Sequence, residues 1–101
     1  MGSRIQLHDI LVEALGLRNV YYQPPESLKL QYPCIVYSRS KSDINYADNH
    51  AYRNTKKYLA TVIDKNPDSV IPDKLEEKTY FTLDRTAFGD NLNHWYFTVY
   101  F

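Results

Sequence analysis

The final seven residues of the chain alternate strictly between apolar side chains and side chains with a polar tip. Apolar residues occupy the odd positions from Trp95 to Phe101, and tyrosine or threonine occupies the even positions between them. Because successive side chains of a β-strand point to opposite faces, this pattern predicts a strand with one buried face and one tyrosine-rich face. A shorter alternation begins at Phe81, and the Gly-Asp-Asn segment at 89–91 predicts a turn between the two runs. We therefore expect a β-hairpin over residues 79–101.

The N-terminal segment is typical of an amphipathic helix over residues 3–17. Ser3 and Gln6 have the spacing of a capping box, in which each side chain bonds a backbone N–H at the start of the helix. Gly16 can adopt the left-handed conformation that ends a helix, and we expect Leu17 to fold back over the last turn. The apolar residues recur at spacings of three and four and form one stripe: Leu7, Ile10, Leu11, Ala14 and Leu15.

Three short apolar segments in the middle of the chain predict further strands. The first covers residues 20–22 and ends before two prolines, which cannot donate the hydrogen bonds of a β-ladder. The second covers residues 34–37 and is rich in β-branched side chains, and the third covers residues 58–64. The core residues expected in the third strand are Leu59, Val62 and Ile63.

A short helix is predicted after the third of these strands. Asn66 and Pro67 suit a helix cap and a first turn, and Ile71 with Leu75 provides an apolar stripe. Pro72 limits this helix to about two turns, because inside a longer helix its ring would clash with an upstream carbonyl.

The predicted order of elements is therefore α-β-β-loop-β-α-β-β. This order indicates a single domain over residues 1–101 with an α+β fold. We expect a small mixed or antiparallel β-sheet sandwich, with the N-terminal helix and the short second helix packed on one face of the sheet. The residues expected to be buried, one from each main element, are Leu11, Val36, Val62, Leu83 and Phe97.

The composition argues against several classes of function. Twelve basic residues balance twelve acidic ones, and a neutral chain lacks the surplus of cations that gripping a nucleic acid backbone requires. No apolar run approaches the ~20 residues of a membrane span. The single cysteine, Cys34, cannot form an internal disulfide and suits a reducing cytoplasm. Ten tyrosines are typical of protein interfaces, although half-buried sheet faces favour tyrosine as well.

Residues 40–54 form a long polar loop in this scheme. A stretch of this length without regular structure is often functional in a small domain, so we expect it to become ordered on contact with a partner. The same loop could offer oxygen ligands to calcium, but the calcium-loop pattern requires glycine where Asp48 stands and glutamate where Asn54 stands. The residues expected to bind the partner are Asp43, Tyr46, Asp48, Asn49 and Tyr52.

The sequence contains no catalytic or cofactor signature. Its three glycines do not have the spacing of a phosphate-binding loop. His8, His50 and His94 lie far apart, and none belongs to a metal-ligand pattern such as H-x-x-x-H. Cys34 follows Pro33 in an apolar strand, which is typical of a buried and inert thiol. We therefore predict no enzymatic activity, no cofactor and no metal site, and a small enzyme or metal-binding module is the alternative.

Several short motifs follow one another along nearly the whole chain, after the leading helix. They are Tyr32-Pro33 before a core strand, Tyr46-Ala47-Asp48-Asn49 with Tyr52, Val62-Ile63-Asp64, Ile71-Pro72-Asp73-Lys74 and Asp90-Asn91-Leu92-Asn93-His94. None of them is specific alone. Their order and spacing resemble the tail terminator, or tail completion, proteins of long-tailed bacteriophages.

The resemblance implies a virion structural protein that is assembled in the host cytoplasm. Such a protein forms a ring, usually of six subunits, that caps the tail tube and joins it to the head connector. The implied partners are further copies of the chain, the major tail tube protein and a head completion or connector protein, with no sequence-specific contact to nucleic acid and no membrane. The resemblance supplies no catalytic residue. The main alternative is another neck component of the same virion, such as a head completion protein.

Overall fold

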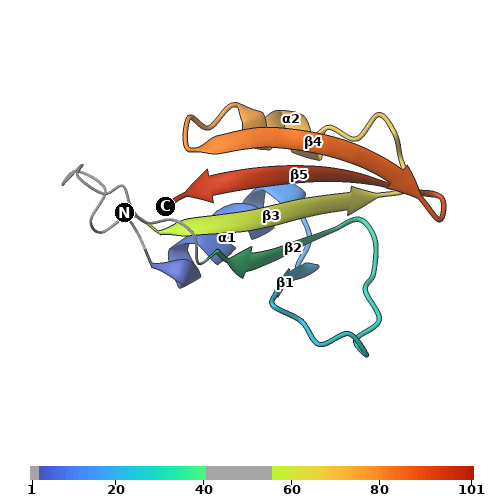
Figure 1. Ribbon diagram of the computed structural model, residues 1–101, viewed down its shortest axis with the longest axis horizontal. Coiled ribbons are helices and arrows are strands. Elements are labelled where there is room, and N and C mark those ends of the chain that lie inside the picture. Colours follow the sequence, from blue (N-terminus) through green and yellow to red (C-terminus); the bar gives the residue numbers. More distant parts are fainter. Residues whose placement is uncertain (1–2, 41–55) are drawn as a thin grey trace.

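The computed structural model describes residues 3–40 and 56–101 of the chain. Its strands form one five-stranded sheet in the order β1-β2-β3-β5-β4, in which β1 and β2 are parallel and the other neighbouring pairs are antiparallel. The predicted α+β fold and the predicted order of helices and strands are confirmed. The elements are α1 Arg4–Leu15, β1 Val20–Tyr22, β2 Cys34–Arg39, β3 Lys57–Asp64, α2 Ile71–Glu76, β4 Phe81–Gly89 and β5 Leu92–Tyr100 (Figure 1).

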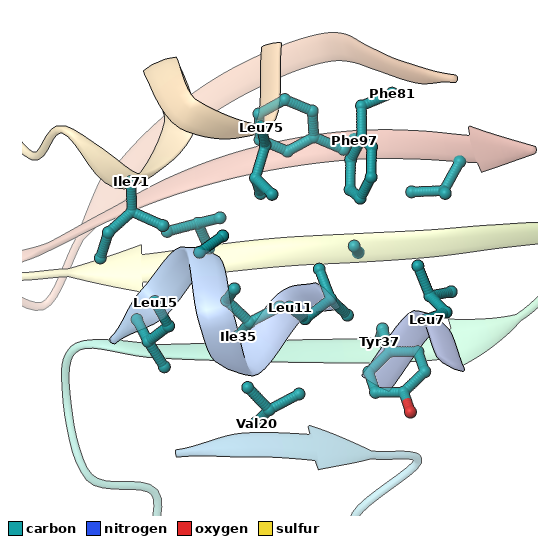
Figure 2. Packing of buried hydrophobic residues seen from close by; sticks show 14 of the residues in the cluster. Leu7, Leu11, Leu15, Val20, Ile35, Tyr37, Ile71, Leu75, Phe81 and Phe97 are labelled. Carbon is teal, nitrogen blue, oxygen red and sulfur yellow. The ribbon is translucent and has the colours of Figure 1, made fainter. Parts of the chain in front are cut away.

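The two helices cover one face of the sheet and lie behind it in the view of Figure 1. Figure 2 shows the core between these layers, where Leu7 and Leu11 of α1 and Leu75 of α2 pack over the strands. The strand residues beneath them include Ile35 of β2 and Phe97 of β5. In the described part of the chain, no helix lies on the opposite face of the sheet, which we call the open face.

The predicted caps of α1 are present. The hydroxyl of Ser3 accepts a hydrogen bond of 3.2 Å from Gln6 N, and Ser3 N donates one of 2.8 Å to Gln6 Oε1. Gly16 ends the helix with a φ of 80°, and its N–H donates to Val12 O. The prediction for Leu17 is wrong, because this side chain is 47% exposed. The chain turns away at Gly16 towards β1, and Val20 is the next apolar residue to enter the core.

The strict alternation of β3 overturns the prediction for Leu59. Tyr58, Ala60 and Val62 face the helices and belong to the core, whereas Leu59 lies on the open face with 45% of its surface exposed. Two strand residues three positions apart point to opposite faces, so Leu59 and Val62 could not both face the helices. Ile63 is buried as predicted, although it lies on the open face.

The five residues predicted to be buried divide into two groups. Leu11, Val62 and Phe97 each expose 1% of their surface or less, as predicted. Val36 is only half-buried because it lies on the open face, where the alternation of β2 places it. Leu83 is also half-buried, packed against the core from β4 at the edge of the sheet. The full burial predicted for these two residues is therefore wrong.

The second helix starts later than predicted. Asn66 and Pro67 belong to a turn, in which Asn66 Oδ1 accepts from Asp68 N at 2.9 Å and Asn66 O accepts from Ser69 N at 3.2 Å. The helix begins at Ile71, and Pro72 lies in its first turn. Proline is compatible with that position because the first N–H groups of a helix have no partner inside the helix.

The hairpin of β4 and β5 turns through two residues. Asp90 and Asn91 both have positive φ angles, 54° and 62°, which is the conformation of a type I′ turn. Gly89, predicted to be part of the turn, is instead the last residue of β4 and pairs with Leu92. The turn type suits the right-handed twist of the two strands and fixes their register.

Candidate functional site

The residues predicted to bind a partner are Asp43, Tyr46, Asp48, Asn49 and Tyr52. All five lie outside the described residues, as does the alternative calcium loop, so these assignments remain predictions. Their segment joins β2 to β3. On either side of it, the described chain is held together by a backbone hydrogen bond of 2.8 Å from Ser40 N to Lys57 O.

The open face carries apolar, aromatic and hydroxyl side chains in cross-strand rows. The register of the sheet aligns Ser38, Leu59, Thr98 and Thr82 in one row, and Tyr21, Val36, Thr61 and Tyr96 in the next. Leu59 is 45% exposed although β3 is the central strand, and Tyr100 is 47% exposed on β5. The next row, in which Cys34 pairs with Ile63, offers little exposed surface on these two strands, because both side chains are buried.

A β-bulge adds a pair of charges to the open face. The register of β4 against β5 shifts between Leu83 and Arg85. Asp84 is the extra residue of this bulge, which lets it and Arg85 both reach the open face. The Thr98 hydroxyl donates a hydrogen bond to Asp84, and the guanidinium of Arg85 lies 4.0 Å from the centre of the Tyr96 ring.

The arrangement of the open face suits binding to another protein surface. Tyrosine and arginine are enriched at such interfaces, and polar side chains usually form the rim around them. His94 belongs to the same surface, since its ring stacks on Tyr96 at 6.0 Å with an interplanar angle of 10°. The His94 ring therefore lies nearly parallel to the Tyr96 ring, and each ring limits the orientation of the other.

A second polar cluster lies on the helix side of the sheet, around the buried hydroxyl of Tyr37. Nδ1 of His8 and this hydroxyl share a hydrogen bond of 2.7 Å, and Arg4 Nη1 donates to the same oxygen at 3.4 Å. The Arg4 guanidinium also lies 4.5 Å from the centre of the Tyr22 ring. Burial raises the pKa of Tyr37, and the hydrogen bond from Arg4 opposes part of that rise. These contacts attach the first turns of α1 to β1 and β2.

Cys34 has the properties of a structural residue. Its side chain is fully buried, as the sequence predicts. Burial, and secondarily the charge of Asp64, raises the pKa of the thiol to about 11. Because the thiolate is the nucleophilic form, the neutral thiol of the folded protein is a poor nucleophile at neutral pH.

Within residues 3–40 and 56–101, no group of three or more His, Cys, Asp or Glu side chains is placed to hold a metal ion. No helix in these two ranges is both long and apolar enough to cross a membrane. Comparisons of the chain with protein-family models, curated proteins and solved structures found no match.

Sequence reasoning identified part of the open face and missed the rest. The alternation at the C-terminus placed Tyr96, Thr98 and Tyr100 together on the face opposite the core, and the structure agrees. The exposed position of Leu59 was detectable from the period of β3. The bulge that adds Arg85 had no signal in the sequence, because its neighbours lack the glycine that marks some bulges.

Proposed function

We propose that this protein is a structural subunit of a phage virion, which forms a ring that caps the tail tube and joins it to the head connector. The proposal rests first on the resemblance of its ordered motifs to tail terminator proteins. The structural observation that carries it is the open face, with Leu59 and Tyr100 almost half exposed. A surface of this kind has a physical reason to bind another protein, because binding would remove apolar area from water.

A two-layer subunit suits repeated assembly. One layer is the sheet with its open face, and the other contains the helices. Two different surfaces on opposite sides of a subunit allow a head-to-tail interface, which closes into a ring when the rotation per subunit is right. The neutral net charge does not oppose the association of copies. The expected ring is a hexamer that resides at the junction of head and tail.

The proposed role requires no catalytic reaction by histidine or cysteine side chains, which are common catalytic groups in enzymes. His8 is bonded to Tyr37 and belongs to the contact between helix and sheet. Cys34 is buried as the neutral thiol. Both side chains therefore have structural functions that explain their positions without a catalytic role.

The genetic test is deletion of the gene from the phage or prophage that carries it, followed by electron microscopy of the lysate. We expect DNA-filled heads beside unjoined tails, many of them of abnormal length, because the terminator sets where tail growth stops. Complementation with the intact gene should restore joined virions. Normal joined virions without the gene would refute the proposal. Intact heads beside free tails of normal length would instead favour the connector alternative.

A further inference from the structure

The exposed side of α1 carries an isoleucine and two carboxylates in one line. Ile5, Asp9 and Glu13 follow at spacings of four residues, on the side opposite the buried Leu7 and Leu11. Ile5 is 62% exposed, and both acidic side chains are exposed. We call Ile5, Asp9 and Glu13 the outer stripe of α1.

The open face offers the complementary arrangement of charge. Lys57 and the exposed Arg85 lie on the same surface as Leu59. The acid beside them, Asp84, already accepts a hydrogen bond from the Thr98 hydroxyl. The exposed leucine therefore lies on a surface with two cations, whereas the exposed isoleucine of the outer stripe is followed by two anions.

We propose that copies of this chain associate by packing the open face of one subunit onto the outer stripe of α1 of the next. Ile5 would be buried near Leu59, and Asp9 and Glu13, which both lie on the same side of Ile5, would approach Arg85 and fix the orientation. The inference rests on the proposed function and specifies its interface. Because the two surfaces lie on opposite sides of the two-layer subunit, each copy can bind two others, as a ring requires.

Two substitutions test the two surfaces separately. Leu59→Glu places an anion opposite the anions of the outer stripe, and Ile5→Lys places a cation opposite the cations of the open face. The control is Phe88→Asp, because Phe88 is 69% exposed at the hairpin end of β4 and belongs to neither surface. Light scattering over a series of concentrations should show that each interface variant raises the concentration for half-assembly by about tenfold or more. The control should assemble like the unmodified protein.

Mixing the two interface variants tests the head-to-tail geometry. Each variant keeps the surface that the other has lost, so an equal mixture should associate at concentrations where either variant alone stays a single chain. Packing of one open face on another would instead leave Ile5→Lys fully able to assemble, and this result would overturn the inference. Circular dichroism and the melting temperature should confirm that both variants are folded. If either variant unfolds, the milder pair Leu59→Thr and Ile5→Gln replaces them.

The outcomes separate this inference from the proposed function. An oligomer that neither variant weakens would overturn the interface described here and leave the ring-forming role standing. A protein that stays a single chain at every concentration would overturn both. Binding of the unmodified protein to a different partner through the open face, without self-association, would also contradict the inference.

Discussion

The guanidinium of Arg85 lies 4.0 Å from the centre of the Tyr96 ring, across the boundary between β4 and β5. This contact exists because a bulge shifts the register of β4 after Leu83 and lets Arg85 face the same way as Tyr96. The pair places a cation on the open face and holds it over an aromatic ring. A rigid charge of this kind orients a partner at lower entropic cost than a freely moving lysine.

The coupling between Arg85 and Tyr96 is measurable in the isolated subunit. A double-mutant cycle with Arg85→Gln and Tyr96→Leu should give a coupling free energy of about 0.5–1 kcal/mol, the range for cation–π pairs at exposed sites. The measurement is the free energy of unfolding by urea for the four proteins, at a concentration too low for self-association. Additive effects of the two substitutions would show that the contact contributes nothing to stability.

The two faces of the sheet should respond differently to truncation. Phe97→Ala removes a side chain that is 1% exposed and should lower the free energy of unfolding by about 3–5 kcal/mol. Leu59→Ala, the matched control on the open face, should cost much less, because Leu59 is already 45% exposed. Chemical denaturation of both variants checks this order. A larger loss for Leu59→Ala would mean that the faces of β3 and β5 have been assigned the wrong way round.

Elements with a clear period could be predicted from the sequence. The alternation from Trp95 to Phe101 determined both the strand and its buried face, and the capping box of Ser3 and Gln6 marked the start of α1. The continuous apolar run around Val36 has no such period. It therefore predicted a strand without indicating which of its residues face the helices.

The candidate site was harder to predict because it depends on contacts between distant segments. Arg85 reaches the open face through a bulge, and Asp84 is positioned there by Thr98, fourteen residues away. The side chain of Asn66 accepts a hydrogen bond from Asp68 N and forms a local turn in place of a helix cap. The second helix, α2, therefore begins only at Ile71. Neither effect follows from composition or from spacing along the chain.

The positive φ of Asn91 predicts how two substitutions at the hairpin turn change the stability of the fold. Asn91 has a φ of 62°, a conformation that glycine adopts with little strain, so Asn91→Gly should leave stability unchanged or raise it slightly. Asn91→Val should lower the free energy of unfolding by about 1–3 kcal/mol, since β-branched residues are strained at positive φ. Thermal denaturation of the two variants tests the turn type. Equal melting temperatures would contradict it.

The buried thiol predicts how stability changes at alkaline pH. Burial raises the pKa of Cys34 from 9.0 to about 11, so the folded state holds a proton that the unfolded chain releases. This difference does not lower the free energy of unfolding below pH 9, but it lowers that free energy as the pH rises from 9 towards 11. Cys34→Ala should therefore lose less stability than the unmodified protein between these limits. Tyr37, whose pKa is also raised, is present in both proteins and cancels in the comparison. Parallel declines of stability with pH in the two proteins would show that Cys34 is not responsible.

The mass of the protein in solution tests most directly whether the chain is the ring-forming structural subunit that we propose. Multi-angle light scattering from micromolar to millimolar concentration should show the mass rising from the 11.9 kDa of one chain towards a plateau at six times that value. A plateau is expected because a closed ring stops growing when its last interface forms. A mass of one chain across the whole range would contradict the account.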